Sequence, residues 1–305
     1  MVTVTVTEGK VTLDDGAEVY TKTWKAAPEQ ARVLFIHGFS DHCGNYEMVH
    51  PYLASRGISV HGFDQRGFGR SVKSKAERGM TGTTDRVLAD ITCMLRSILS
   101  DTSSSAPLFV YGHSMGGAET LTYASLDPDN LVNRIRGFVV QAPLIALAPE
   151  TRPYAITKII GRVVARVLPH HQMVNPLEPS NLSRNEEDNK RWRDDPLNHD
   201  TGTLEGLGDM LDRGEALESG QYRLAEGKNE GGKTRILLIH GTADKINEFA
   251  ASKRWMEKSC DAKDKKFWQL DGWYHNMHAE PEVETFRSGI ADWILERSGS
   301  VQSEA

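Results

Sequence analysis

The chain has 305 residues, with 36 basic and 42 acidic side chains and a formal net charge of −6 at pH 7. This negative balance argues against electrostatic binding of nucleic acid, and a chain of this length can bury a large core. The three cysteines, Cys43, Cys93 and Cys260, are too widely spaced to indicate a disulfide framework or a zinc site. We therefore expect a cytoplasmic protein that needs no metal and no other cofactor.

Apolar runs alternate along the chain with helical patterns. Alternating valine and threonine predict a first strand over Val2–Thr7 rather than a signal peptide, and a second strand follows over Val19–Trp24. Further strands are predicted at 31–38, 58–64, 107–112, 135–143, 234–241 and 265–270, and helices at 46–55, 84–99, 115–126, 247–259 and 281–297. This order is typical of an α/β fold with a mainly parallel central sheet and helices on both faces. No stretch approaches the roughly 18 apolar residues of a membrane span.

One long segment interrupts the alternation. Between Pro143 and Lys233 we predict no strand, and the segment is too long for a loop. We expect a helical cap over 146–232 inserted between two parts of the core, 1–145 and 233–298, with a flexible tail over 299–305. In the cap, apolar residues that include Ile159 and Val163 recur at helical spacing. This stripe either packs on the core or lies on a membrane or lipid-droplet surface and admits an acyl chain.

The stretch FVYGHSMGGAE, residues 109–119, crowds glycines around Ser114. It fits the G-x-S-x-G pattern, with an apolar strand before it and a helix of good formers after it. Such a strand-to-helix turn exposes the serine hydroxyl and places the Met115 amide at a helix N-terminus, where it can face an oxyanion. The alternative is an ordinary turn without a nucleophile.

A serine hydroxyl needs a base that takes its proton and an acid that orients the base. Asp244 and His275 each follow a predicted strand, in the chain order serine, acid, histidine. We predict them as the acid and the base, with Asp271 and His278 as the alternatives. A second oxyanion amide is expected from Phe39, in the sharp turn after the strand that begins at residue 31.

With these motifs the chain resembles the monoacylglycerol lipases of the α/β-hydrolase superfamily, from about Val33 to Arg297. The resemblance is carried by HGFSDH (37–42), FDQRGFGRS (63–71), GHSMGG (112–117), LSRN (182–185), DPL (195–197), HGTAD (240–244) and YHNMH (274–278). It implies that Ser114, Asp244 and His275 form the triad and that Phe39 and Met115 supply the oxyanion amides. It also implies that Asp41 and His278 contact the hydroxyls of the glycerol.

Two positions depart from the family pattern. Asn45 stands where animal members tend to carry arginine, and Trp192 stands where they carry tyrosine. The glycerol contacts are therefore expected to differ in this chain, with Trp192 as one of the substrate-binding residues.

The expected function is hydrolysis of monoacylglycerols to fatty acid and glycerol through an acyl-enzyme, with Ile159 and Val163 of the cap admitting the lipid ester. Because a fold and a triad do not fix the substrate, two alternatives stay open. The first is a related serine esterase acting on lysophospholipids, diacylglycerols or fatty acid alkyl esters. The second is a catalytically silent binding protein with the same fold. The sequence does not define the oligomeric state.

Overall fold

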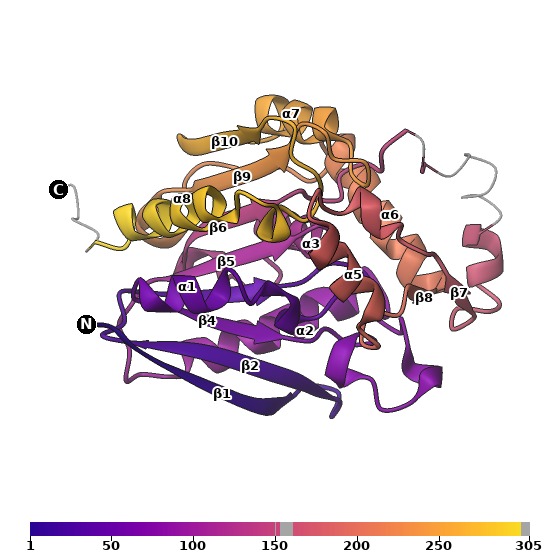
Figure 1. The fold of residues 1–305 in the computed structure, drawn as a ribbon, viewed down its shortest axis with the longest axis horizontal. Coiled ribbons are helices and arrows are strands. Elements are labelled where there is room, and N and C mark those ends of the chain that lie inside the picture. Colours follow the sequence, from indigo (N-terminus) through magenta and orange to yellow (C-terminus); the bar gives the residue numbers. More distant parts are fainter. Residues whose placement is uncertain (150, 153–160, 300–305) are drawn as a thin grey trace.

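An eight-stranded sheet forms the centre of the computed structural model, which describes residues 1–149, 151–152 and 161–299 (Figure 1). The strand order is β1-β2-β4-β3-β5-β6-β9-β10; β1 and β2 are antiparallel to their neighbours, and the other pairs are parallel. The strands are β1 (Thr3–Thr12), β2 (Glu18–Ala27), β3 (Ala31–Ile36), β4 (Ile58–Phe63), β5 (Leu108–His113), β6 (Ile135–Gln141), β9 (Arg235–Gly241) and β10 (Asp264–Leu270).

Helices cover both faces of this sheet. Apolar side chains of α2 (Thr84–Leu99), α3 (Met115–Leu126) and α7 (Phe249–Lys258) share one buried cluster with alternate residues of the strands. Those of α1 (His50–Ser55) and α8 (Val283–Glu296) share a second cluster with the residues between them. Because β3, β5, β6 and β9 are buried along their whole length, they read as continuous apolar runs in the sequence. The predicted α/β fold is confirmed.

Two helices have the predicted bounds, and three others are shorter than predicted. The Thr83 side chain accepts a hydrogen bond from the Arg86 amide and so caps α2 at its predicted start. The region predicted as one helix over 46–55 divides into a 3₁₀ turn, Cys43–Tyr46, and α1, which starts at His50 with proline at its first turn. Proline suits this position because its missing N–H has no partner there.

The segment between β6 and β9 contains two more strands, so the prediction that it has none is wrong. β7 (Gln172–Val174) and β8 (Thr201–Thr203) pair antiparallel, and α5 (Glu186–Asp194) and α6 (Leu204–Glu218) accompany them. Figure 1 shows α5, α6, β7 and β8 together at one side of the molecule. Each strand has only three residues, too few for a recognisable alternation.

A buried ion pair joins this segment to the core. Arg213 of α6 donates to Oε1 of Glu119 on α3 at 3.2 Å, and the two side chains are 2% and 0% exposed. A second bond runs from Arg213 to the Thr84 hydroxyl at the start of α2 (3.1 Å). The helix that carries Met115 is therefore tied to α6 by opposite charges.

Within the described ranges, no helix has both the length and the apolar character to span a membrane.

Candidate active site

Ser114 occupies a tight turn between β5 and α3. Its backbone has a φ of 57°, in the left-handed region that disfavours residues other than glycine. Gly112 and Gly116, on either side of Ser114, lie so close to neighbouring backbone that a side chain would not fit. A Cβ on Gly112 would lie 2.2 Å from the Gly116 carbonyl oxygen, and a Cβ on Gly116 would lie 2.3 Å from the Ile36 carbonyl oxygen. The crowding of glycines around one hydroxyl thus follows from close backbone contact, and Met115 begins α3 beside Ser114.

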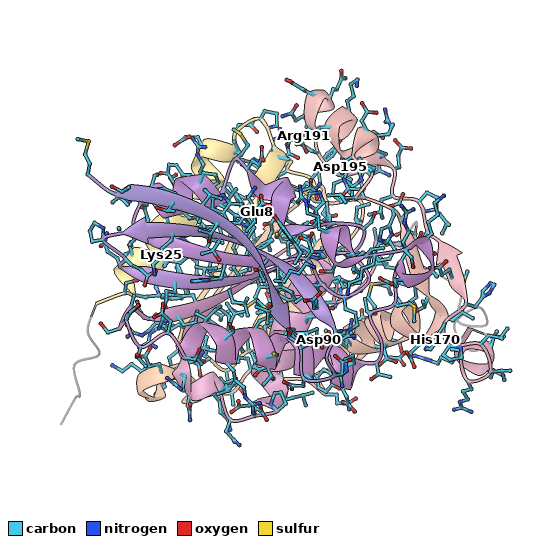
Figure 2. All side chains as sticks on the ribbon, turned by 90° about the horizontal axis from the view of Figure 1, so that it is seen from below. Glu8, Lys25, Asp90, His170, Arg191 and Asp195 are labelled. Carbon is cyan, nitrogen blue, oxygen red and sulfur yellow. The ribbon has the colours of Figure 1, made fainter. Side chains whose placement is uncertain are left out.

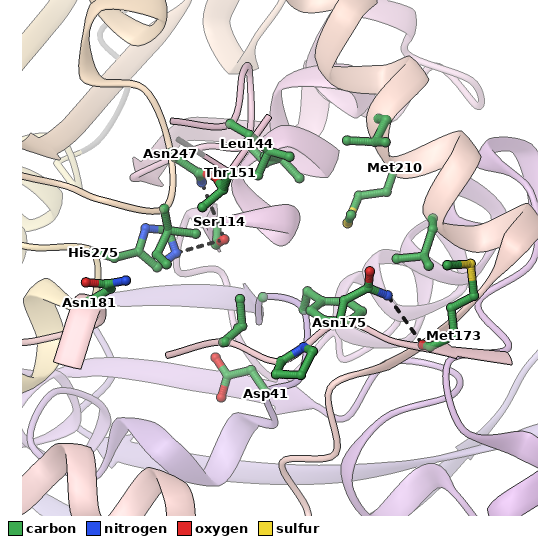
Figure 3. A pocket seen from close by; sticks show the side chains of 18 of the residues that line it. Asp41, Ser114, Leu144, Thr151, Met173, Asn175, Asn181, Met210, Asn247 and His275 are labelled. Atoms are coloured by element: carbon green, nitrogen blue, oxygen red, sulfur yellow. Dashed lines mark hydrogen bonds between the residues drawn. The ribbon is translucent and has the colours of Figure 1, made fainter. Parts of the chain in front are cut away.

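The three residues predicted as nucleophile, base and acid lie in hydrogen-bonding order. His275 Nε2 is 3.0 Å from Ser114 Oγ, and His275 Nδ1 is 2.8 Å from Asp244 Oδ2 (Figure 3 shows the first contact). Since Nδ1 faces a carboxylate, it carries the ring proton, and Nε2 can accept the proton of the hydroxyl. The residues meet because β5, β9 and β10 are parallel and end at one edge of the sheet. The alternative acid Asp271 instead accepts from the Thr242 hydroxyl in an exposed turn.

Asp244 is held by a second histidine that the sequence analysis missed. His240 Nε2 donates to Asp244 Oδ2 at 3.0 Å, and its other ring nitrogen contacts the Ser252 hydroxyl at 2.9 Å. Burial alone raises the pKa of Asp244, but the His275 and His240 imidazoles outweigh this effect and hold the pKa well below its usual value. The carboxylate therefore stays ionised and can stabilise a protonated His275. In the sequence, His240 was visible only as the first residue of the motif HGTAD (240–244).

Phe39 lies in a turn directly against Ser114. A Cβ built on Gly38 would lie 3.1 Å from Ser114 Cβ, so the turn after β3 passes the nucleophile elbow at contact distance. His37 fixes this turn. Its Nε2 accepts a hydrogen bond from the backbone N–H of Gln65 (2.8 Å), so its Nδ1 carries the ring proton and donates to the Gly38 carbonyl (2.7 Å). The Phe39 and Met115 residues predicted to supply oxyanion amides thus flank Ser114 on two different elements.

Asp41 forms the polar end of the site together with Tyr46, a residue that the sequence analysis did not single out. Asp41 Oδ2 accepts the Tyr46 hydroxyl at 2.5 Å, and Oδ1 accepts the Asn45 amide at 2.7 Å. Because the Tyr46 hydroxyl gives its proton to Asp41, His113 Nδ1–H donates to the Tyr46 oxygen (2.7 Å). Burial opposes ionisation of Asp41, yet the contact with His113 and nearby imidazoles keep its pKa well below the usual value.

Neutral histidines surround this carboxylate. Burial lowers the pKa of His113 to about 4, and it lowers the pKa of His278 well below its usual value. The His113 ring centre lies 4.9 Å from that of His275, so a charged His113 would oppose protonation of His275. At neutral pH these two histidines are therefore uncharged, whereas Asp41 and Asp244 are ionised.

His278 lies behind the wall of the site. Its ring centre is 4.1 Å from that of Tyr46, and its Nδ1 contacts the Gln141 side chain at 3.0 Å. Among the described residues that line the cavity at Ser114, His278 is absent. The structure therefore does not bring His278 to the surface where the resemblance placed it, whereas Asp41 and Trp192 both line that surface.

A cavity of about 610 Å³ opens at Ser114, and its wall is mostly apolar. Figure 3 shows Asp41 below Ser114 and Met210 to the right of it. The indole of Trp192 is largely buried and contacts Leu182 and Ile246. The apolar part of the wall comes from both the core and the segment between β6 and β9: Leu144, Leu147, Leu177, Leu182, Leu204, Leu207, Met210, Leu211 and Ile246.

The predicted apolar stripe of the cap is described only in part. Ile159 lies outside the described residues, whereas Val163 is 56% exposed beside Gly161 and Arg162 of the cavity wall. Arg162 does not stand free for lipid head groups, because it forms ion pairs with Asp212 and Glu215 of α6. His170, labelled in Figure 2, lies in the segment 161–171 that precedes β7. The exposed apolar side chains of residues 161–171 and of β7, here named the apolar cap surface, are Val163, Val164, Val167, Leu168, Met173 and Val174.

The comparisons with known proteins agree with this fold. A family model described as serine aminopeptidase, S33, matches residues 27–282. The chain belongs to this family, and it is a serine hydrolase with the α/β-hydrolase fold.

Within the family, the chain is similar to monoglyceride lipases. A putative monoglyceride lipase of Schizosaccharomyces pombe is 34% identical over 92% of this chain and 72% of its own length. The human monoglyceride lipase is 27% identical over 94% of this chain and 89% of its own. The crystal structure of a soluble variant of the Saccharomyces cerevisiae monoglyceride lipase, in complex with a substrate analog, superposes with a TM-score of 0.86 at 25% identity, covering 96% of each chain.

Proposed function

We propose that this protein hydrolyses monoacylglycerols to a free fatty acid and glycerol through an acyl-enzyme on Ser114. The observation that carries the proposal is the hydrogen-bonded series from Asp244 through His275 to Ser114 at the wall of a largely apolar cavity. The similarity to monoglyceride lipases over most of the chain supports this choice of substrate.

The mechanism assigns one role to each residue. His275 Nε2 takes the proton of Ser114 as Oγ attacks the ester carbonyl, and Asp244 stabilises the imidazolium and keeps the proton on Nδ1. The backbone N–H groups of Phe39 and Met115 donate hydrogen bonds to the carbonyl oxygen and stabilise the negative charge that develops on it. His275 then protonates the departing glycerol, and water repeats the sequence on the acyl-enzyme.

The polar end of the cavity favours an uncharged alcohol. Asp41 is ionised and lines the cavity, so it accepts hydrogen bonds from glycerol hydroxyls. The same charge repels a phosphate on the leaving group, which disfavours lysophospholipids relative to monoacylglycerols. Trp192 closes this end with an apolar ring, and His278 supports it from behind through Tyr46 and Gln141.

The experiment that tests the function combines labelling with a substrate panel. The purified protein is treated with a fluorophosphonate probe and assayed on nitrophenyl esters and on long-chain mono-, di- and triacylglycerols and lysophospholipids. We expect labelling that Ser114→Ala abolishes and a preference for monoacylglycerol. Labelling without that preference would keep the serine esterase and reject the substrate. A well-folded protein with neither labelling nor turnover would be a silent binding protein.

We further propose that residues 146–232 act as a cap whose apolar surface contacts a membrane or lipid droplet. Val167 and Val174 are 76% and 67% exposed, and Met173 and Val174 also line the cavity. An exposed apolar surface that continues into a substrate cavity suits transfer of an acyl chain out of a lipid layer.

The free cysteines Cys43, Cys93 and Cys260 fit the reducing conditions of the cytoplasm.

Aspartate substitutions test this contact. Val163→Asp combined with Val167→Asp should reduce hydrolysis of long-chain monoacylglycerol in vesicles while sparing a soluble short-chain ester, because buried charge opposes insertion into lipid. Val6→Asp, on a 49% exposed position of β1, is the control because β1 lies away from the segment around β7 (Figure 1). Equal losses on both substrates would contradict the contact.

A further inference from the structure

We propose that Asn247 is a further catalytic residue, which donates a hydrogen bond from Nδ2 to Ser114 Oγ and stabilises negative charge there. Nδ2 lies 3.5 Å from Oγ, at the long limit of a hydrogen bond. Asn247 lines the cavity, and its side chain is buried. The inference rests on the proposed role of Ser114 as nucleophile.

Neighbouring groups fix the direction of the Asn247 amide. Nδ2 donates to the Ala142 carbonyl oxygen at 2.8 Å, and exchanging the amide nitrogen and oxygen would bring two oxygens together. Its backbone is held as well, because the Asn247 N–H donates to Asp244 Oδ1 (3.0 Å) and residue 247 forms a β-bridge with Leu147. The second N–H of the amide is therefore directed at Ser114 rather than free to turn away.

Two nitrogens thus reach Ser114 Oγ from different elements: His275 Nε2 accepts its proton, and Asn247 Nδ2 donates a hydrogen bond to it. Figure 3 shows Ser114 contacted by both His275 and Asn247. During attack, the O–H bond of Ser114 breaks toward His275 while the bond from Oγ to the acyl carbon forms. During release, that bond breaks, its electron pair returns to Oγ, and His275 returns the proton. Oγ carries excess negative charge at both points, and a preplaced N–H lowers the energy of each.

The length of the contact does not weaken this role. Catalytic hydrogen bonds are often long without substrate and tighten in the reacting complex. Asn247 Nδ2 keeps its bond to the Ala142 carbonyl through one N–H while the other faces Oγ, so the amide stabilises Oγ without a rearrangement. The sequence analysis placed this residue only at the start of a helix, because its spacing from Asp244 does not reveal where the side chain points.

Asn229 provides a matched control. It is also buried, and its Nδ2 also donates to a backbone carbonyl, that of Ile135 (3.0 Å). Its Oδ1, like that of Asn247, has no hydrogen-bond partner among the residues that the structure describes. Ile135 begins β6, whereas Ser114 follows the carboxyl end of the neighbouring strand β5. Asn229→Leu therefore removes a buried side-chain amide of the same kind, at a position away from Ser114.

The test compares Asn247→Leu with Asn229→Leu by melting temperature, kcat, KM and the rate of labelling by a fluorophosphonate. For Asn247→Leu we expect kcat and the labelling rate to fall together by about 10- to 100-fold at unchanged KM, whereas Asn229→Leu loses only stability. If Asn247→Leu does not fold, Asn247→Ala has the same expected effect. A labelling rate equal to that of Asn229→Leu would overturn the inference. Labelling does not require monoacylglycerol, so failure of the proposed substrate is recognised separately.

Discussion

Replacing Arg213 by methionine removes one half of the buried ion pair between α6 and α3. The Glu119 carboxylate, 0% exposed, is then left without its partner. Breaking a buried pair in this way costs about 3–5 kcal/mol, because the remaining charge is not compensated. With an unfolding entropy of about 2.1 cal/mol/K per residue, or roughly 640 cal/mol/K for the whole chain, the melting temperature should fall by about 5–8 °C.

This cost should depend on pH. Burial raises the pKa of Glu119 to about 7, and attraction to Arg213 offsets only part of that rise, against a usual value of 4.5. The native state therefore binds more protons than the unfolded state between these values, and Glu119 makes the protein less stable as the pH rises through this window. Arg213→Met removes the attraction that lowers the Glu119 pKa, so this pKa rises further and the carboxyl stays protonated, with little cost, at low pH. The cost should therefore grow as the pH rises above about 7.

Thermal unfolding at about pH 5.5 and about pH 8.5 measures this difference. Lys10→Met is the control, since it removes an exposed pair with Glu18 whose contribution to stability is screened by solvent at either pH. The double variant Glu119→Leu, Arg213→Met should recover most of the loss at high pH because it leaves no charge behind. An equal fall in melting temperature at both pH values would refute the reasoning.

Three further substitutions probe the site. Asp244→Asn should lower kcat by about 10⁴-fold in steady-state assays, because the wrong tautomer of His275 is stabilised, and a loss below tenfold would contradict its role. His240→Phe removes one donor to Asp244 and should lower kcat by about tenfold at similar KM; an unchanged kcat would show that the His240 contact is not needed to hold the carboxylate. Gly116→Ala puts a Cβ against the Ile36 carbonyl oxygen, so we expect the variant either to misfold, as seen by circular dichroism, or to lose fluorophosphonate labelling. Normal labelling would argue against the tight turn.

Much of the architecture could be predicted because it depends on local pattern. The buried parallel strands form continuous apolar runs, and α2 starts at its cap, so both were recognisable in the sequence. Ser114 could be found from the G-x-S-x-G pattern, and Asp244 and His275 from the chain order serine, acid, histidine and from their places after predicted strands. Their meeting in hydrogen-bonding order agrees with the prediction, whereas their catalytic roles stay a prediction.

What the sequence did not reveal depends on contacts between distant elements. Tyr46, His240 and Asn247 act through the direction of one side chain, which is set by packing and not by spacing. The ion pair between Glu119 and Arg213 required knowing that α6 docks on α3. β7 and β8 form by pairing with each other, and a strand of three residues is too short to show an alternation of apolar and polar residues in the sequence.

The pairing of β6 with β9 bears on how the protein is made in the cell. These strands are neighbours in the sheet, although the whole segment that carries α5 and α6 is synthesised between them. Ser114 and its glycine turn leave the ribosome well before the strands that bring Asp244 and His275, and chains tend to fold from the N-terminus as they emerge. A nascent chain therefore exposes the serine without its base, and esterase chemistry should begin only once translation has delivered the last strand of the sheet.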